Sequence, residues 1–271
     1  MSEAGPASQV PDQGEARVLT VAGLKGGLGR TTVAVNLAAL LALTERQILL
    51  VDLDPMGAAT AALGHQRDNR NDRMPAFAEP VHFLKHIVTA PRFPGLSLWP
   101  GGAMLNEIEA RLWNRPDASR DKILEKSLSK ARSTYDLIIV DAPASQGPLC
   151  RNGLACADDF LLPVLGQGLD KNTVARTLEL ALEARPESSA AFRCFCLKMA
   201  RESAFQISEL TPECQSRVTV LESALVEDVE TTTEALIRGL TLFEHRPCSR
   251  VTRAFIEVCR EIQHRVFDED F

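Results

Sequence analysis

The chain lacks the cysteine spacing of a metal or redox motif, since no CxxC pair occurs in it. Its seven cysteines are an odd set scattered over 271 residues, which argues against a disulfide framework and favours a reduced, cytoplasmic protein. No apolar run approaches the about 20 residues that a membrane-spanning helix needs. The polar, acidic N-terminal segment lacks the basic and apolar regions of a secretory signal. We therefore expect no membrane partner.

Lysine is scarce, with 7 residues against 23 arginines. Acidic residues number 36, so the net charge is −6, and any nucleic-acid contact requires a local basic patch. Hydrophobic residues make up 45% of the chain and charged residues 24%, as in ordinary soluble domains. This composition excludes a collagenous, coiled-coil or wholly disordered chain.

Apolar runs that suit buried strands alternate with helical patterns. Strands are predicted at 17–23, 47–54, 95–102, 135–143, 158–165, 192–198 and 217–223. Helices are expected from the glycine-rich turn to about Thr44, over 103–133 with a break at Pro116, and over 170–184 and 251–266. The alternation predicts an α/β fold, namely a doubly wound, mostly parallel sheet with helices on both faces.

One domain is expected over 17–266, between a disordered tail at 1–16 and an acidic tail at 267–271. The polar segment 64–80 is interpreted as a loop or short lid. In open α/β sheets, ligands bind beyond the carboxyl ends of the strands. Here those ends carry a glycine-rich loop, Asp52, Asp54 and Asp141.

The glycine-rich loop KGGLGRTT joins the first predicted strand to the first helix. Its three glycines let backbone N–H groups turn inward around phosphate oxygens, and the following helix directs its positive end at the same anion. Thr31 can offer its hydroxyl to Mg²⁺, and Arg30 can contact the β- and γ-phosphates. The loop departs from the strict pattern GxxxxGK[ST], because Leu24 stands at the first glycine and Arg30 at the lysine.

The same loop resembles the deviant Walker A box, KGGxGKT[ST], of the ParA/MinD group of P-loop ATPases. Three further segments agree in order and spacing. LLVDLDPMGAAT at 49–60 is similar to the ParA box, YDLIIVDAPAS at 135–145 resembles the Walker B strand, and EALIRGLTLFE at 234–244 resembles the stretch before the last helix. The resemblance extends from 17 to about 262 and favours the ParA branch.

The resemblance implies roles for the matching residues. Lys25 matches the lysine that reaches across a nucleotide-sandwich dimer, and Asp54 matches the residue that positions or activates the attacking water. These two are the expected catalytic residues. Mg²⁺ is expected at Thr31, Asp52 and Asp141. The phosphates of ATP are expected to be bound by the residues of the loop, which are Gly26, Gly27, Leu28, Gly29, Arg30, Thr31 and Thr32.

The resemblance also implies an ATP-dependent switch that partitions plasmid or chromosomal DNA, or positions protein cargo on the nucleoid. ATP would close a homodimer that binds DNA non-specifically, and an activating partner protein would stimulate hydrolysis. Arg246, Arg250 and Arg253 are candidate DNA contacts, although the preceding stretch at 222–230 is acidic. The acidic ending FDEDF argues against the basic membrane helix of the MinD branch. The expected location is the cytoplasm, in association with the nucleoid.

Two alternatives stay open. Arg30 in place of lysine predicts slow Mg-dependent hydrolysis, which favours a weakly hydrolysing ATP-binding adapter of an envelope machine such as exopolysaccharide (cellulose) synthesis or secretion. A reductase of the nitrogenase iron-protein type would need paired cysteines for a cluster, and no cysteine precedes Cys150. His82 and His86 have metal-like spacing, but the sequence offers no third ligand nearby.

Overall fold

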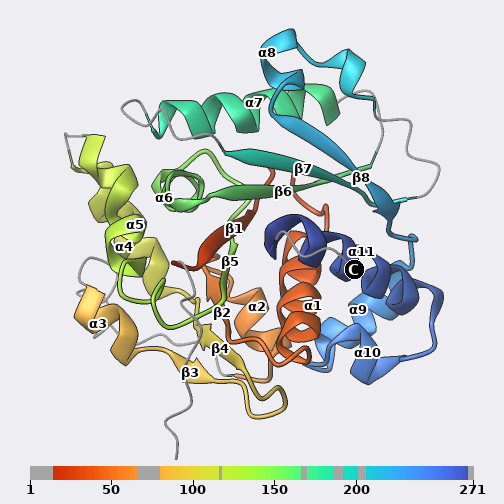
Figure 1. Ribbon diagram of the computed structural model, residues 1–271. Coiled ribbons are helices and arrows are strands. Elements are labelled where there is room, and N and C mark those ends of the chain that lie inside the picture. Colours follow the sequence, from red (N-terminus) through yellow and green to blue (C-terminus); the bar gives the residue numbers. More distant parts are fainter. Residues whose placement is uncertain are drawn as a thin grey trace, which may run out of the picture.

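The computed structural model of the protein describes residues 15–65, 80–115, 118–165, 170–185, 192–200 and 206–267. These residues form one eight-stranded sheet with helices packed on both faces (Figure 1). The doubly wound, mostly parallel sheet predicted from the sequence is confirmed. The strands are β1 (Arg17–Val21), β2 (Ile48–Asp52), β3 (Val88–Thr89), β4 (Leu96–Trp99), β5 (Leu137–Asp141), β6 (Asp159–Val164), β7 (Arg193–Lys198) and β8 (Val218–Ala224).

The strands lie in the order β3-β4-β2-β5-β1-β6-β7-β8. All neighbours run parallel except the short edge strand β3, which is antiparallel to β4. The seven predicted strands are all present, with ends close to the predicted ones. Strand β3 was missed because its two residues are too few to produce a periodic pattern.

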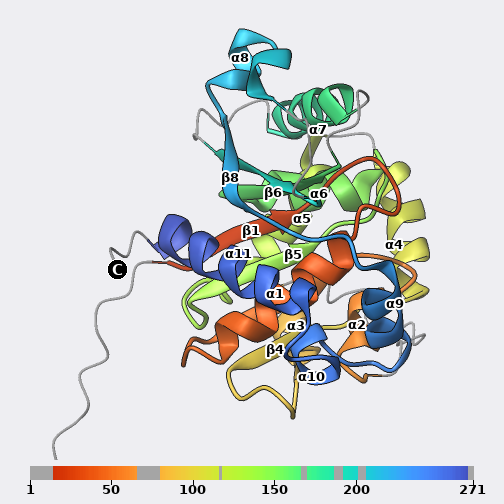
Figure 2. The same cartoon turned by 90° about the vertical axis from the view of Figure 1, so that its right-hand side faces the viewer.

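The helices divide between the two faces of the sheet (Figures 1 and 2). One face is covered by α1 (Arg30–Ala42), α2 (Ala58–Ala62), α9 (Val229–Ile237), α10 (Leu242–His245) and α11 (Arg250–Phe267). The other face is covered by α3 (Pro80–Lys85), α4 (Met104–Trp113), the 3₁₀ helix η2 (Ala118–Lys122), α5 (Ile123–Leu128), α6 (Pro148–Cys156) and α7 (Asp170–Glu183). The 3₁₀ helix η3 (Ile207–Glu209) and α8 (Pro212–Gln215) precede β8.

The predicted helix break near Pro116 is confirmed, since α4 ends at Trp113 and η2 begins at Ala118. Pro116 itself lies outside the described residues, as do most of the segment 64–80 and almost all of the two predicted tails. The proposed domain boundaries therefore stay a prediction.

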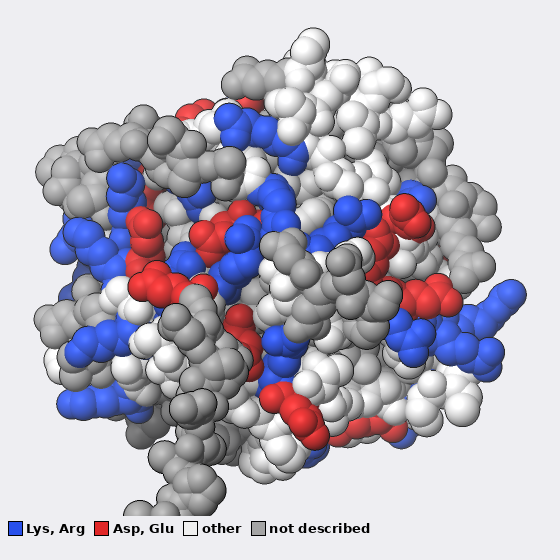
Figure 3. Space-filling view, viewed as in Figure 1, with Lys and Arg blue, Asp and Glu red and all other residues white. Residues whose placement is uncertain are grey.

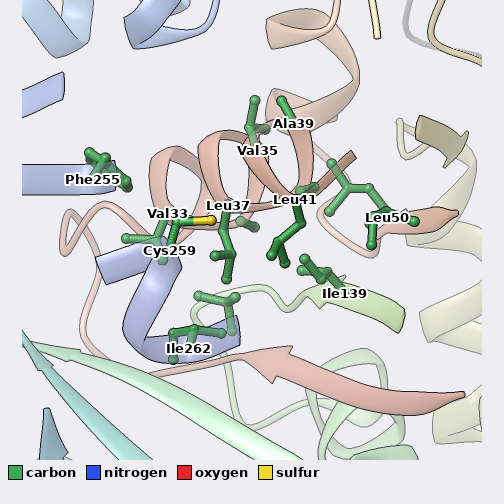
Figure 4. Packing of buried hydrophobic residues seen from close by; sticks show 14 of the residues in the cluster. Val33, Val35, Leu37, Ala39, Leu41, Leu50, Ile139, Phe255, Cys259 and Ile262 are labelled. Atoms are coloured by element: carbon green, nitrogen blue, oxygen red, sulfur yellow. The ribbon is translucent and has the colours of Figure 1, made fainter. Parts of the chain in front are cut away.

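Alternate residues of the central strands point to opposite faces of the sheet. Leu50 and Ile139 lie beside α1, as Figure 4 shows, in the same core as the buried residues of α11. Leu49 and Ile138 pack on the opposite side, in the core that includes α4, α5 and α6. All four side chains are fully buried. Because both faces are covered, the central strands are apolar along their length, and their charged residues are confined to the strand ends.

Candidate nucleotide-binding site

Three of the predicted site segments meet at one edge of the sheet. The glycine-rich loop follows β1, while Asp52 and Asp141 are the last residues of β2 and β5. Strand β5 lies between the other two, and its Asp141 is paired in register with Val21 of β1 and Asp52 of β2. The sheet order therefore brings the loop and both carboxylates together beyond the carboxyl ends of adjacent parallel strands.

The β1–α1 loop has the backbone of an anion-binding turn. Gly27 and Gly29 hold φ angles of +76° and +73°, a left-handed conformation in which other residues are strained. A Cβ atom at Gly26 or Gly27 would meet nothing within 4 Å among the described residues, so this side of the loop is open. Gly29 is also the N-cap of α1, where no described side chain caps the helix. The first-turn N–H groups and the helix dipole are thus available to an anion.

Arg30, the first residue of α1, folds back across this loop. Its Nη1 donates hydrogen bonds to the backbone oxygens of Gly23, at 2.9 Å, and Lys25, at 2.6 Å. Its Nε is buried and has no hydrogen-bond partner among the described residues. Burial lowers the pKa of Arg30, while the charge of Asp141 acts in the opposite direction. The Nη1 edge of the guanidinium therefore holds the loop, and its positive charge interacts with Asp141 and Asp54.

Asp52 is buried and engaged by the loop that follows it. Its Oδ2 accepts hydrogen bonds from the N–H and hydroxyl of Thr60, at 2.9 and 2.7 Å, and its Oδ1 accepts one from the N–H of Asp54. Burial raises the pKa of Asp52 to about 6, in spite of these hydrogen bonds, which lower it. A Cβ at Gly101 would lie 2.6 Å from the Asp52 Cγ, so the carboxyl group packs directly against that glycine.

Asp141 is equally buried, but neither of its carboxylate oxygens has a hydrogen-bond partner among the described residues. Burial raises its pKa well above the usual value, and the charge of Asp52 raises it further. The nearby Thr31 and Arg30 act in the opposite direction and favour the carboxylate. An unsatisfied carboxylate beside a threonine hydroxyl and an anion-binding loop fits a Mg²⁺ ion, which prefers oxygen ligands and is commonly shared with phosphates.

The two predicted catalytic residues lie at the rim of the site. Asp54 is half-buried, and its Oδ1 accepts a hydrogen bond from the N–H of Met56 at 2.8 Å. Lys25 is also half-buried and lies in the loop next to the exposed Gly26. Both residues are therefore accessible beside the loop, and their catalytic roles stay predictions.

A cavity of about 460 Å³ lies beside the loop, towards α9 and α11. Its wall combines loop residues with mainly apolar side chains that follow β7 and β8, among them Met199, Leu225 and Val226. This volume suits a small ligand held largely by apolar contacts. Sequence reasoning did not identify this wall, because only the sheet order brings these distant segments to the loop. The contact of Thr60 with Asp52 was also missed, although Thr60 ends the LLVDLDPMGAAT segment.

Comparison with known proteins identifies the family. The family model AAA_31, described as an AAA domain, matches residues 16–181. The chromosome-partitioning ATPase Soj of Thermus thermophilus is 31% identical over 254 residues, which cover 92% of this chain and 96% of Soj. The chain belongs to the ParA/MinD family of P-loop ATPases.

Other relatives of this ParA-like ATPase match over part of their length. The chromosome partitioning protein ParA of Myxococcus xanthus is 39% identical over 157 residues, which is about half of either protein (55% of this chain and 52% of ParA). The sporulation initiation inhibitor protein Soj of Bacillus subtilis is 33% identical over 148 residues, 55% of this chain and 58% of that protein.

Solved structures share the fold. Apo McdA of Cyanothece has a TM-score of 0.71 at 20% identity, covering 89% of this chain and 98% of McdA. MinD of Pyrococcus horikoshii, solved with Mg-ADP, has a TM-score of 0.68 at 21% identity, covering 94% of this chain and 100% of MinD. Cobyrinic acid a,c-diamide synthase of Mycobacterium smegmatis, solved with ADP and magnesium, has a TM-score of 0.66 at 25% identity, covering 94% and 97%.

The candidate DNA contacts of this ParA-like ATPase lie before and along the start of α11, in mixed surroundings. Arg246 forms an ion pair with Glu234 of α9 at 3.2 Å. The stretch 222–253 contains six acidic residues and four arginines. The predicted DNA role of Arg246, Arg250 and Arg253 stays a prediction, and acidic side chains weaken the positive potential there.

Within the described part of the chain, no helix is long and apolar enough to cross a membrane. The same residues contain no group of three His, Cys, Asp or Glu side chains arranged to hold a metal ion. His82 and His86 thus lack a third ligand of these types there. A Mg²⁺ ion bound to a nucleotide differs, because the phosphates and water supply most of its ligands.

Proposed function

We propose that the protein binds ATP with Mg²⁺ at the β1–α1 loop and acts as an ATP-dependent dimerising switch of the ParA type. One observation carries this proposal, the placement of a glycine-rich anion-binding loop next to Asp141, a buried carboxylate without a hydrogen-bond partner among the described residues. A phosphate group and a divalent cation satisfy such a loop and such a carboxylate together.

The loop residues Gly26–Thr32 would hold the phosphates through their backbone N–H groups. Thr31 and Asp141 would hold Mg²⁺, which neutralises the phosphate charge during transfer. Asp52 would keep its hydrogen bonds with Thr60 and shape the loop after β2. It would therefore act on the ion through its charge and its position.

Asp54 and Lys25 would act from the rim of the site. Asp54 is partly accessible, and one of its oxygens is not engaged by Met56, so it can orient a water molecule towards the terminal phosphate. Lys25 is half-buried in the open loop, and in the proposed dimer its ammonium would contact the phosphates bound by the second protomer.

The relatives support a role in positioning DNA or protein cargo. Those named Soj and ParA are described as partitioning chromosomes. We infer that this chain works in the cytoplasm as a nucleotide-gated homodimer on the nucleoid, with hydrolysis stimulated by a partner protein.

Nucleotide-dependent dimerisation is the direct test. Light scattering of the wild type with ATP–Mg is expected to give twice the mass found with ADP–Mg or without nucleotide. Lys25→Ala is expected to bind ATP yet stay monomeric, while Lys85→Ala, which alters an exposed lysine at the end of α3, behaves like the wild type. Absence of ATP binding, or the same mass in every nucleotide state, would contradict the proposed switch.

The geometry of Arg30 favours a second candidate function, a weakly hydrolysing adapter of an envelope machine. Its guanidinium is held by two loop carbonyls, and its planar shape fixes the direction of the remaining N–H groups. A cation fixed in this way contacts bound phosphates to a similar extent before and during transfer. Such uniform binding tightens the complex without raising kcat.

Arg30→Lys separates the two candidates. If Arg30 limits hydrolysis, the lysine variant should raise kcat about tenfold, equivalent to about 1.4 kcal/mol of barrier, while ATP affinity changes less. Fast hydrolysis by the wild type, or a lysine variant no faster than the wild type, would remove the adapter as a candidate.

A further inference from the structure

Glu109 is an acidic residue of α4 that turns away from solvent. Figure 3 shows acidic and basic side chains together on the left-hand side of the molecule, where Figure 1 places α4 and α5, so exposed acidic residues are ordinary on this surface. Glu107 of the same helix is exposed, whereas Glu109 is half-buried. Burial raises the pKa of Glu109 and so opposes its charged form. A carboxylate that is partly buried in this way needs a hydrogen-bond donor.

The donor belongs to the first turn of α6. The backbone N–H of Leu149, the second residue of that helix, donates a hydrogen bond to the Glu109 carboxylate, which acts to lower the pKa of the group. The first N–H groups of a helix have no partner within it, and a side chain just before the helix usually caps them. The N-cap of α6 is Gly147, which has no side chain to offer. Glu109 therefore caps α6 from another helix.

The same contact explains why residue 147 is a glycine. Its φ and ψ angles are −72° and 173°, an extended conformation that any residue adopts, so the backbone does not require glycine here. A Cβ atom at Gly147 would overlap Oε1 of Glu109 and lie 3.2 Å from its Cδ. The carboxylate thus occupies the space that a side chain at 147 would fill. A larger residue there would displace the carboxylate and break the cap.

The loop at 142–147 connects Asp141 to α6 and is fixed at both ends. At its start, the N–H of Ala142 donates a hydrogen bond to the backbone oxygen of Val21 at 3.1 Å, which extends the pairing of β5 with β1. At its end, the Glu109 cap holds the first turn of α6 against α4. Because this short loop is held at both ends, its course beside Asp141 depends on the cap.

Helix α6 is held in place independently of its cap. All of its residues except Arg151 are buried. The side-chain oxygen of Asn152 accepts the N–H groups of Ile123 and Leu124 at 3.0 Å each, which holds α6 against the start of α5. Release of Glu109 would therefore alter the preceding loop more than the helix.

We propose that Glu109 is a positioning residue of the candidate nucleotide site. By capping α6 from α4, it holds the loop after Asp141 in the course that leaves this carboxylate free to meet Mg²⁺. A misplacement of about 1 Å at a site group can be costly even when its cause lies far from the chemistry. The proposal rests on the proposed function, since it concerns how ATP–Mg is bound. It goes beyond that function by extending the site to α4, none of whose described residues lines the cavity beside the glycine-rich loop.

ATP binding with and without Mg²⁺ tests this role. Titration calorimetry gives the gain in ATP affinity from Mg²⁺, as the ratio of the dissociation constants measured in EDTA and in Mg²⁺. Glu109→Ala is expected to reduce this gain about tenfold and to lower kcat to a similar extent, while the affinity in EDTA, which depends on the glycine-rich loop, changes less than about twofold. Glu107→Ala makes the same change at an exposed site of α4 and should behave like the wild type.

Gly147→Ala releases the carboxylate while keeping it in the protein. This variant is expected to reduce the gain from Mg²⁺ as Glu109→Ala does. The double variant should be no worse than either single variant, because the two substitutions break one contact. Additive losses would show that the two residues act separately, and would overturn the inference.

A local cap separates positioning from stability. Glu109→Ala is expected to lower Tm, since α6 loses its cap. In Glu109→Ala/Gly147→Ser, the serine hydroxyl can cap α6 from the usual position, which should restore Tm but not the gain from Mg²⁺. Recovery of both quantities would show that Glu109 serves only as a helix cap, and would overturn the proposed role. An unchanged gain in Glu109→Ala would overturn it as well, whereas a wild type that binds no ATP would contradict the proposed function itself.

Discussion

The two ends of the central strands carry buried aspartates in opposite states. At the amino end, Asp159 of β6 is fully buried, and its carboxylate accepts hydrogen bonds from the Nε atoms of Arg17 and Arg193 at 2.8 and 2.7 Å. At the carboxyl end, Asp141 of β5 is 1% exposed, and its oxygens have no hydrogen-bond partner among the described residues. A buried carboxylate costs free energy unless it is paired. The amino end is therefore built for stability, and the carboxyl end keeps a buried carboxyl group that a ligand can satisfy.

The difference teaches where function is to be sought in this fold. Salt bridges also join Asp158 to Arg132 at the amino end. At the carboxyl end, burial and the charge of Asp52 raise the pKa of Asp141, and the Nε of Arg30 has no hydrogen-bond partner within the described structure. Perturbed groups that collect in one place are typical of a binding or catalytic site.

The largest expected effect comes from breaking the amino end. Asp159→Ala leaves the charges of Arg17 and Arg193 without their shared partner, which is expected to lower the free energy of unfolding by about 3 kcal/mol. Urea denaturation measures the change. Glu179→Ala, which removes an exposed partner of Arg176, should cost less than about 0.5 kcal/mol. Equal losses of stability in the two variants would show that the buried ion pairs of Asp159 stabilise the protein no more than the exposed pair of Glu179.

The opposite sign is expected at the carboxyl end. Asp141→Asn removes a buried carboxyl group whose oxygens have no hydrogen-bond partner among the described residues, so the nucleotide-free protein should become more stable. The same variant should lose the contribution of Mg²⁺ to ATP affinity, measured by titration calorimetry with and without the ion. Destabilisation of the empty protein by this substitution would mean that the carboxylate is satisfied in the native state.

The pH dependence of stability sharpens the same contrast. Asp52 has a pKa of about 6 in the folded protein against the usual 3.8, so between these values the folded state holds more protons than the unfolded state. The contribution of Asp52 to the free energy of unfolding should therefore fall by about 2 kcal/mol at most as pH rises from about 4 to about 6. Burial is the main cause of the shift, and Asp54→Asn should flatten the fall slightly, because the charge of Asp54 also raises the pKa of Asp52. An unchanged slope in chemical denaturation at stepped pH would contradict the coupling.

A smaller effect is expected at the glycine that ends the loop. Gly29→Ala places a side chain at φ +73°, and its Cβ would lie 3.0 Å from Cε of Met199. The left-handed backbone conformation should lower the free energy of unfolding by about 1 kcal/mol. The contact with Met199 should add little, because the flexible end of that side chain can move aside. Met199→Ala in the same background should recover little stability. Full recovery would show that the contact, and not the backbone conformation, sets the cost.

Local pattern was enough to predict the fold and the loop, but not the charge arrangement around them. The seven longer strands were predicted because strands buried on both faces are apolar along their length. Helix α6 was not predicted, although Pro148 at its first position is a helix-start signal. The ion pair between Arg246 and Glu234 joins two helical segments. Only the packing of these segments shows that an acidic side chain reduces the positive charge of the arginines that are clustered in the sequence.

The sequence by itself determined the seven longer strands, the glycines of the β1–α1 loop and the acidic residues at the strand ends. These features depend on neighbouring residues, on backbone freedom and on the alternation of apolar side chains. The tertiary structure alone decided which charges are satisfied. It turned Asp121 and Glu109 towards α6, held Asp52 against Thr60 and left Asp141 unpartnered within the described residues. The physical reason is that burial and pairing depend on which segments the fold brings together. Asp52 and Thr60 are eight positions apart, whereas Asp121 and Arg151 are separated by 30 positions in the chain.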